Sequence, residues 1–140
     1  MHKMIQGITS QFVEPAWEYV EDYIADALKH GIGEYTIDDI KQACQEQRMQ
    51  LWIKWDDEEV KGVFVTQILN YPQLKVLLVL LLSGNNFKEW RDETDELLTR
   101  FAKEKECKYI ELFGRKGWGK GFLSEINYKE QVRLFTKEIV

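Results

Sequence analysis

The sequence predicts a single α/β (α+β) domain over residues 1–140, with a mixed central sheet of about six strands flanked by about four helices. Three observations support this prediction. Apolar residues repeat at helical spacing near the N-terminus and change to alternation at Met49. Residues 74–82 are almost wholly apolar, as in a central strand covered on both faces. A second helical stretch follows, and a chain of 140 residues can bury the core of one domain.

The N-terminal part is expected to hold one short strand and two helices. The strand covers residues 4–8, and Pro15 opens the first helix, because proline suits a first helical turn. Gly31 ends that helix. Thr36 stands three residues before Asp39, the spacing of a capping box at the start of a second amphipathic helix. Two helices therefore precede the main sheet.

An antiparallel hairpin should come next. Residues 49–55 alternate between apolar and polar, the acidic residues 56–59 form a turn, and residues 63–68 make the second strand. Trp52 points to the opposite face from its strand neighbours, where either a helix covers it or a partner contacts it. The apolar residues 74–82 then form the middle strand of the sheet.

The C-terminal half is predicted to return to the sheet twice. A long amphipathic helix covers residues 87–101, and a strand at residues 109–113 completes a right-handed parallel crossover. A short helix at residues 122–126 and a closing strand at residues 131–137 follow. Apolar alternation in the closing strand is weak, so one of its faces is expected to be exposed or paired in a homodimer.

Composition and charge exclude several classes of function. The net charge of −5 argues against general binding to nucleic acid or to anionic membranes, since both require a positive field. The longest apolar run, residues 76–82, is too short to span a bilayer, and no signal pattern follows Met1, so a cytoplasmic protein is expected. Cys44 and Cys107 are isolated and are expected to be buried thiols. The two histidines lack partners at metal-ligand spacing, so no metal site is predicted.

The predicted order of elements resembles the GNAT (Gcn5-related N-acetyltransferase) fold across nearly the whole chain. The more specific resemblance is to small GNAT-like proteins encoded by phages and prophages. It lies in five stretches: Tyr35-Thr36 with Asp39-Ile40, Met49-Gln50-Leu51-Trp52, Val65-Thr66, Tyr71-Pro72, and Gly114-Arg115 followed by Gly117-Trp118.

In catalytic GNAT proteins the central strand splays from its neighbour to hold the pantetheine arm of acetyl-CoA, and a glycine-rich loop that opens the long helix binds the pyrophosphate. A helix N-terminus attracts anions through its free N–H groups and its dipole. By this resemblance, the candidate cofactor-binding residues are Ser83, Gly84, Asn85, Asn86, Phe87 and Lys88. The alternative for the same stretch is a strand-to-helix turn with an Asn cap.

This stretch departs from the family pattern. The usual Arg/Gln-x-x-Gly-x-Gly/Ala motif is absent, and Lys88 and Trp90 stand where the resemblance places its paired glycines. Glu89, Asp92 and Glu93 in the first turns of the helix repel a pyrophosphate.

The general acid of the family is not matched either. Many catalytic members carry a tyrosine about five residues before a closing aromatic residue; if that aromatic is Tyr128, the position is occupied by Leu123, which cannot donate a proton. Glu111 and Asp56 are carboxylates near strand ends, and no catalytic role is assigned to them.

A loop rich in glycine and cations is a second candidate site. Residues 114–121 combine four glycines with Arg115, Lys116, Trp118 and Lys120, which suit a phosphate, an acidic partner surface or a single nucleic-acid strand. The alternative is a strand-to-helix turn with Trp118 docked on the core.

Three functional hypotheses follow. The first is a phage- or prophage-type GNAT-like protein with a degenerate acyl-CoA site that works by binding, in virion assembly or on a host factor. The second is an acetyl-CoA-dependent N-acetyltransferase that acts on an amine. The third is a nucleic-acid-binding accessory protein that uses the loop at residues 115–120, although the acidic chain makes nucleic acid the weakest partner.

Overall fold

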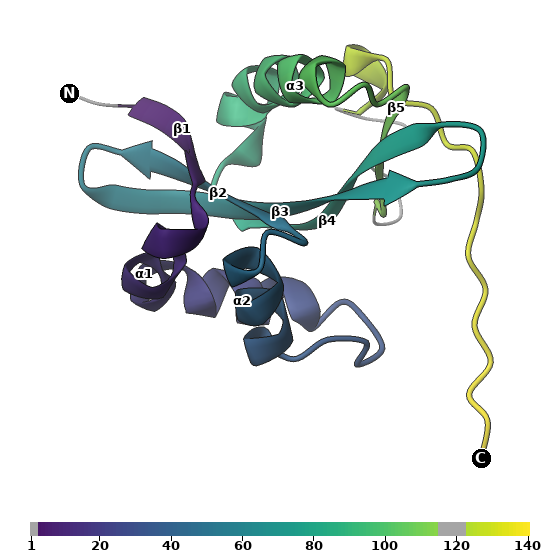
Figure 1. The fold of residues 1–140 in the computed structure, drawn as a ribbon, viewed down its shortest axis with the longest axis horizontal. Coiled ribbons are helices and arrows are strands. Elements are labelled where there is room, and N and C mark those ends of the chain that lie inside the picture. Colours follow the sequence, from purple (N-terminus) through teal and green to yellow (C-terminus); the bar gives the residue numbers. More distant parts are fainter. Residues whose placement is uncertain (1–2, 115–122) are drawn as a thin grey trace.

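The computed structural model describes residues 3–114 and 123–140. Its centre is a five-stranded mixed sheet in the order β1-β2-β3-β4-β5 (Figure 1). The strands are β1 (Lys3–Ile8), β2 (Gln50–Asp56), β3 (Glu59–Asn70), β4 (Lys75–Gly84) and β5 (Tyr109–Leu112). Neighbours are antiparallel except β4 and β5, which are parallel. The predicted hairpin, central strand and parallel crossover are therefore confirmed, and with them the α/β class.

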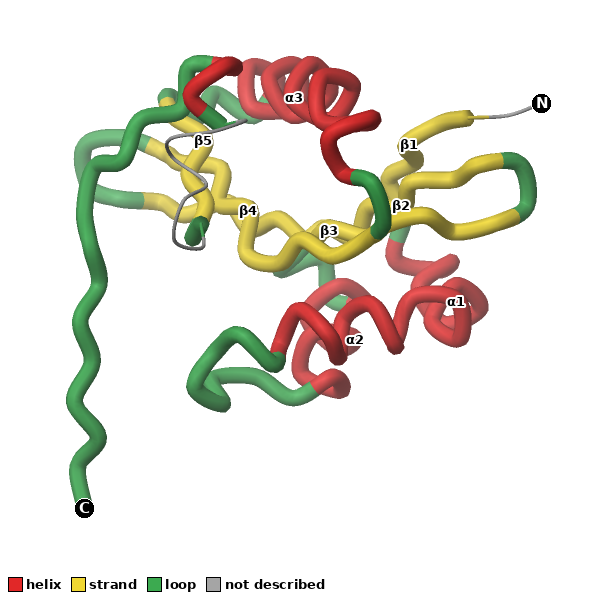
Figure 2. The backbone as a smooth tube through the Cα atoms, turned by 180° about the vertical axis from the view of Figure 1, so that it is seen from behind, coloured by secondary structure: helices red, strands yellow, loops and turns green. Residues whose placement is uncertain are grey.

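Helices cover both faces of the sheet. Helices α1 (Ser10–Leu28) and α2 (Ile37–Gln45) lie on one face, and α3 (Phe87–Glu104) lies on the other (Figures 1 and 2). Each interface has its own cluster of buried apolar side chains. The cluster under α1 and α2 includes Val20, Ile24 and Ile53, and the cluster under α3 includes Phe64, Leu77 and Trp90. The sheet is thus the middle of three layers.

Trp52 belongs to the cluster under α3. Its ring stacks on Phe64 with centroids 5.8 Å apart, and its indole Nε1–H donates to Thr66 Oγ1 at 2.9 Å. Only 8% of Trp52 is exposed. Of the two alternatives for this face of β2, the helix cover is the one observed.

Two local predictions are resolved at the N-terminal helices. The capping box of α2 is present, since Asp39 N–H donates to Thr36 Oγ1 at 3.1 Å and Thr36 N–H donates to Asp39 Oδ2 at 2.8 Å. The predicted start of α1 at Pro15 is wrong, because the helix begins at Ser10 and contains Pro15 in its interior. Val13 is fully buried, so the apolar stripe of the helix extends one turn earlier than predicted. Pro15 has no N–H to donate to the preceding turn, and the helix tolerates this loss because Pro15 lies on its exposed side.

The C-terminal region differs most from the prediction. The short helix is a single 3-10 turn at Ser124–Ile126. Residues 131–137, predicted as a sixth strand, have no strand partner within the described part of the chain, and they leave the body of the protein as an extended segment (Figures 1 and 2). A strand requires a neighbour with free backbone groups, and the alternation of side chains does not provide one. No helix among the described residues is long and apolar enough to cross a membrane.

Candidate functional site

The central strand β4 continues past its neighbour β5. Only residues 76–79 of β4 pair with β5, opposite residues 109–112. The pairing with β3 shifts at the same level, because Val65 faces Leu81 whereas Thr66 faces Val79, which leaves Leu80 as an extra residue. Such a bulge bends a strand and raises its twist. Residues 80–84 therefore extend beyond the last β5 partner seen in the described chain, while residues 81–84 stay paired with β3.

Side chains fill most of the space beside the end of β4. A cavity of about 30 Å³ lies between the end of β4, α3, β5 and residues 123–128, and most of its wall is apolar. That volume matches roughly one water molecule. Its apolar lining is formed by Val79, Leu82, Phe87, Leu98, Leu112, Leu123 and Ile126. A ligand arm longer than a few atoms would have to displace part of this lining.

Two polar side chains close the rim of the cavity. The Tyr128 hydroxyl donates a hydrogen bond to the Asp95 carboxylate, and both residues line the cavity. Burial, and then the negative charge of Asp95, raise the pKa of Tyr128. Burial, and then the charge of Asp92, raise the pKa of Asp95. Tyr128 is therefore a protonated donor that is already bound to a carboxylate.

An ion-pair network ties the 3-10 turn to α3 beside this cavity. Arg91 is 9% exposed, and its Nη1 lies 2.7 Å from Glu125 Oε2 while its Nε lies 3.1 Å from Asp92 Oδ1. The hydrogen bond to Glu125 is the main cause that raises the pKa of Arg91. Leu123 and Tyr128, the two residues compared with the family's general acid and closing aromatic, both line the cavity, and Leu123 is 7% exposed. The resemblance did not reveal that Asp95 and Glu125 are their polar neighbours.

The turn from β4 to α3 holds all six candidate cofactor residues, and both backbone groups of Asn85 are hydrogen-bonded to other parts of the protein. Asn85 N–H donates to the Lys61 carbonyl at 2.8 Å, and the Asn85 carbonyl accepts from Trp90 Nε1–H at 2.9 Å. The Trp90 indole lies over Gly62 and Gly84, where a Cβ on Gly62 would come within 2.6 Å of Trp90 Cη2. We call this packing of Trp90 on the two glycines the Trp90 latch.

The start of α3 has a strained cap rather than an Asn side-chain cap. Asn86 is the N-cap residue with φ 53°, in the left-handed region, and its side chain makes no capping hydrogen bond. Its carbonyl accepts from Glu89 N–H at 2.9 Å. The turn is thus the predicted alternative in outline, and the capping bond is the part that is wrong. Lys88 and Glu89 are both exposed.

Charges on the first turns of α3 are mostly paired with the protein itself. Lys54 Nζ lies 2.8 Å from Glu93 Oε1 across the layer, and Arg91 is held by Asp92 and Glu125. Lys88 is the exposed cation of the first turn, next to the exposed carboxylate of Glu89. The helix dipole favours an anion here, and the nearby carboxylates oppose it.

The second candidate site lies outside the described residues. Arg115, Lys116, Trp118 and Lys120 fall in the stretch 115–122, so their proposed binding role stays a prediction. Of the two unassigned carboxylates, Glu111 is exposed on β5 and Asp56 is half-buried at the end of β2, and neither lines the cavity.

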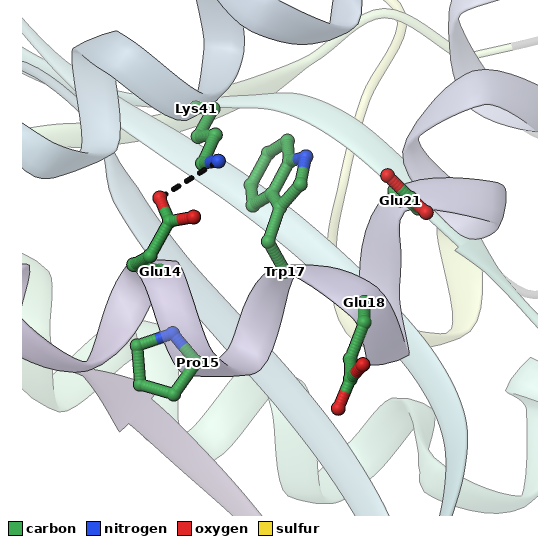
Figure 3. A pocket seen from close by; sticks show the side chains of 6 residues that line it. All are labelled: Glu14, Pro15, Trp17, Glu18, Glu21 and Lys41. Atoms are coloured by element: carbon green, nitrogen blue, oxygen red, sulfur yellow. Dashed lines mark ion pairs between the residues drawn. The ribbon is translucent and has the colours of Figure 1, made fainter.

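A wider and more open hollow lies between α1 and α2, on the opposite face of the sheet from α3. It has a volume of about 440 Å³ and is lined by Glu14, Pro15, Trp17, Glu18, Glu21 and Lys41 (Figure 3). Glu14 and Lys41 point toward one another with the Trp17 ring beside them, at a distance of 2.7 Å from Lys41 Nζ to Glu14 Oε2 (Figure 3). The hydrogen bond from Lys41 lowers the pKa of Glu14. This pair ties the two helices together, and sequence reasoning did not single it out.

The thiols are structural rather than reactive. Cys44 is 3% exposed, and burial raises the pKa of its thiol to about 12, which confirms the expected buried thiol. Cys107 is half-buried, and neither cysteine is in a disulfide. Within residues 3–114 and 123–140, no group of three or more His, Cys, Asp or Glu side chains could hold a metal ion.

Comparison with known proteins gives a match in structure only. No protein-family model and no curated protein matches the sequence. Solved structures match over almost the whole chain. An aminoglycoside acetyltransferase from an uncultured soil metagenomic sample superposes with a TM-score of 0.75 at 9% identity, covering 100% of both chains.

Two further structures extend the range of acetyltransferases that share this architecture. A second aminoglycoside acetyltransferase from an uncultured soil metagenomic sample, in complex with sisomicin, gives a TM-score of 0.72 at 10% identity over 98% of this chain and 96% of that one. Ribosomal-protein-alanine N-acetyltransferase from Brucella melitensis biovar Abortus 2308 gives 0.65 at 13% identity over 98% and 99%. Identities this low establish architecture alone. This chain therefore has the fold of the GNAT acetyltransferases.

Proposed function

We propose that this chain is a GNAT-fold protein that acts by binding a partner and does not turn over acyl-CoA. The Trp90 latch is the observation that carries the proposal. The turn that would cradle a pyrophosphate needs small residues and free N–H groups. Here Trp90 occupies the space over Gly62 and Gly84, and the backbone groups of Asn85 are bonded to Lys61 and Trp90.

Charge and proton transfer support the same conclusion. Glu89 stands in the first turn of α3 and Asp92 follows closely, and their negative charge opposes an incoming phosphate. If Tyr128 is the closing aromatic of the resemblance, Leu123 takes the place of the general acid, and it cannot transfer a proton. The Tyr128 hydroxyl is held by Asp95, and the pKa of Tyr128 is raised. The charges at the start of α3 and the side chains at positions 123 and 128 are therefore poorly suited to acetyl transfer.

The biological setting is proposed from the sequence resemblance to phage and prophage proteins. We place the protein in the cytoplasm of an infected or lysogenic cell, where it contacts a host factor or a component of the virion under assembly. The shared stretches around Tyr35-Thr36 and Tyr71-Pro72 support this setting. Tyr71 is 52% exposed and is thus accessible to a partner.

The experiment that tests the proposal is calorimetric titration of the protein with acetyl-CoA and with CoA, up to millimolar concentration. An active GNAT acetyltransferase titrated in the same buffer serves as the positive control. We expect no saturable heat at micromolar concentrations of either ligand. Micromolar binding that Lys88→Ala weakens tenfold or more, and that the matched helix-end variant Lys103→Ala leaves unchanged, would sink the proposal.

A second candidate function is an acetyl-CoA-dependent N-acetyltransferase, and one specific observation favours it. The bulge at Leu80, and the extension of residues 80–84 past the last β5 partner, are features that a separation of the two strands for a pantetheine arm would need. In that case residues 83–88 would hold the pyrophosphate with help from Lys88. Mass-spectrometric detection of an acetylated amine, formed in stoichiometric amount with free CoA, would support this function over the first.

A further inference from the structure

The C-terminal segment, residues 129–140, is extended and pairs with no strand among the described residues. It runs away from the body as an extended chain (Figures 1 and 2). Four of its large apolar side chains are almost fully exposed: Val132 80%, Leu134 77%, Phe135 87% and Ile139 85%. An ion pair within the segment joins Arg133 Nε and Glu130 Oε1 at 3.4 Å. A gathering of exposed apolar side chains marks a surface that contacts another protein.

The sheet offers a matching free edge. β5 is the last strand in the sheet order, and among the described residues it pairs with β4 alone. An open edge presents unpaired backbone N–H and C=O groups, which a further strand can satisfy. Tyr109 is 56% exposed and Phe113, directly after β5, is 67% exposed, whereas Ile110 and Leu112 pack toward the α3 cluster. The edge is therefore apolar on its α3 face, and on the other face aromatic residues flank Glu111.

The two surfaces are complementary in one antiparallel register. If Arg133 lies opposite Glu111, then Leu134 lies opposite Ile110 and Val132 opposite Leu112, on the α3 face. On the other face, Phe135 lies opposite Tyr109, so an aromatic pair flanks the pair of opposite charges. Val132, Leu134 and Phe135 then each meet an apolar or aromatic residue of β5.

We propose that residues 131–135 add as a sixth strand to β5 of a second copy of this chain, and that the exchange is reciprocal. The chain of each copy leads its segment away from its own β5 (Figures 1 and 2). Each copy carries one donor segment and one acceptor edge, so an exchange between two copies closes with two-fold symmetry and leaves neither edge open.

The size of the contact suits a stable dimer. Three exposed apolar side chains in the paired stretch of each copy, Val132, Leu134 and Phe135, give six in total, and each loses roughly 60–120 Å² of surface on burial. With the surface that receives them, the total is roughly 700–1,400 Å², which reaches the lower part of the usual range for specific interfaces. Intermolecular pairing also explains why a segment with strand periodicity leaves the fold that it was expected to close. This inference does not depend on whether the protein binds acyl-CoA.

Light scattering coupled to size-exclusion chromatography tests the stoichiometry. Dimer formation depends on protein concentration by mass action, so the measurement is made at roughly 100 micromolar. The wild-type protein should then have twice the mass of one chain. Leu134→Asp should shift the mass to that of one chain, because it places a carboxylate opposite Ile110. Ile32→Asp is the matched control, since Ile32 is 75% exposed and lies far from both surfaces in sequence, and it should remain dimeric. A wild-type protein with the mass of one chain would overturn the proposal.

A disulfide trap tests the register and the identity of the partner strand. Arg133→Cys and Glu111→Cys are combined in a Cys107→Ser background and oxidised at low protein concentration. We expect a disulfide-linked dimer on a non-reducing gel. A disulfide within one chain would show that the segment closes its own sheet, and no disulfide would show that it lies elsewhere; either result refutes the exchange.

Discussion

Gly62→Ala tests whether the Trp90 latch closes the turn at the start of α3. Gly62 is buried in β3, and an added Cβ would meet Trp90 Cζ2, lie 2.6 Å from Trp90 Cη2 and lie 3.1 Å from the Ser83 carbonyl oxygen. Overpacking of this kind costs about 1–3 kcal/mol. The φ of Gly62 is not positive, so alanine also gains about 0.4–1 kcal/mol through the unfolded chain. The expected net loss of unfolding free energy is about 1–2 kcal/mol.

A second substitution isolates the indole as the cause. Trp90→Leu removes the two atoms that the Cβ would meet, so Gly62→Ala in that background should cost less than about 0.5 kcal/mol, which gives a coupling energy of about 1 kcal/mol. Gly84→Ala is the matched control. Its Cβ would lie 2.6 Å from Gly62 Cα and 2.6 Å from the Lys61 carbonyl oxygen, both backbone atoms, so Trp90→Leu should not relieve it.

Urea unfolding followed by far-UV circular dichroism measures these differences, since the loss of Trp90 itself alters fluorescence. In thermal melts the Gly62→Ala shift should be roughly 3–8 °C for a chain of this length. The reasoning is refuted if Gly62→Ala costs the same in both backgrounds, because the indole would then not be the group that fills the space.

Three further predictions concern the ionisable and capping groups. Asp95→Asn should raise the melting temperature at neutral pH, because burial and Asp92 raise the pKa of Asp95 and the folded state then binds more protons than the unfolded state. That gain should shrink as the pH falls toward about 4, the usual aspartate pKa, because the folded-state carboxyl takes up its proton above that value; a gain that grows on acidification would contradict the assignment. Glu93→Ala should cost about 1–3 kcal/mol in urea unfolding, because it leaves the buried Lys54 without its partner at 2.8 Å, whereas Lys54→Met added to it should recover most of the loss; an equal loss in both would refute the pairing. Thr36→Ala should cost about 1 kcal/mol through the lost capping box, and Thr36→Ser should restore most of it; stability that does not separate the two variants would show that the cap is unimportant.

Features that depend on short-range pattern were predictable from the sequence. The Thr36 and Asp39 spacing specifies a capping box within four residues, and alternation specifies the β2 and β3 hairpin. The apolar β4 and the helix after it specify the parallel crossover. In each case the interacting residues are close in sequence, or the spacing of apolar residues, every two in a strand or every 3.6 in a helix, indicates which face is buried.

Features that depend on distant partners were not predictable in the same way. Arg91 meets Glu125 across 34 residues, and Asp95 meets Tyr128, with no periodicity that joins them. One signal was present and not used: Gly62 is a glycine inside a strand pattern, which often marks a close approach of another group. The closing strand shows the converse error, because residues 131–137 have strand character and no partner among the described residues of their own sheet.

The free energy needed to move the Trp90 side chain decides how tightly the turn at the start of α3 could bind CoA. Trp90 is 4% exposed and bonded to Asn85, so moving its side chain out of the core would cost about 3–5 kcal/mol, by analogy with truncation of a buried Trp. Every 1.4 kcal/mol is a factor of ten in affinity, so a turn that would otherwise bind CoA at micromolar concentration would bind it roughly a hundred- to several-thousand-fold more weakly. Binding of that strength lies between roughly 0.1 and several millimolar, which is why the titration must extend to millimolar concentration. The bulge at Leu80 is consistent with either function, whereas the Trp90 latch opposes catalysis.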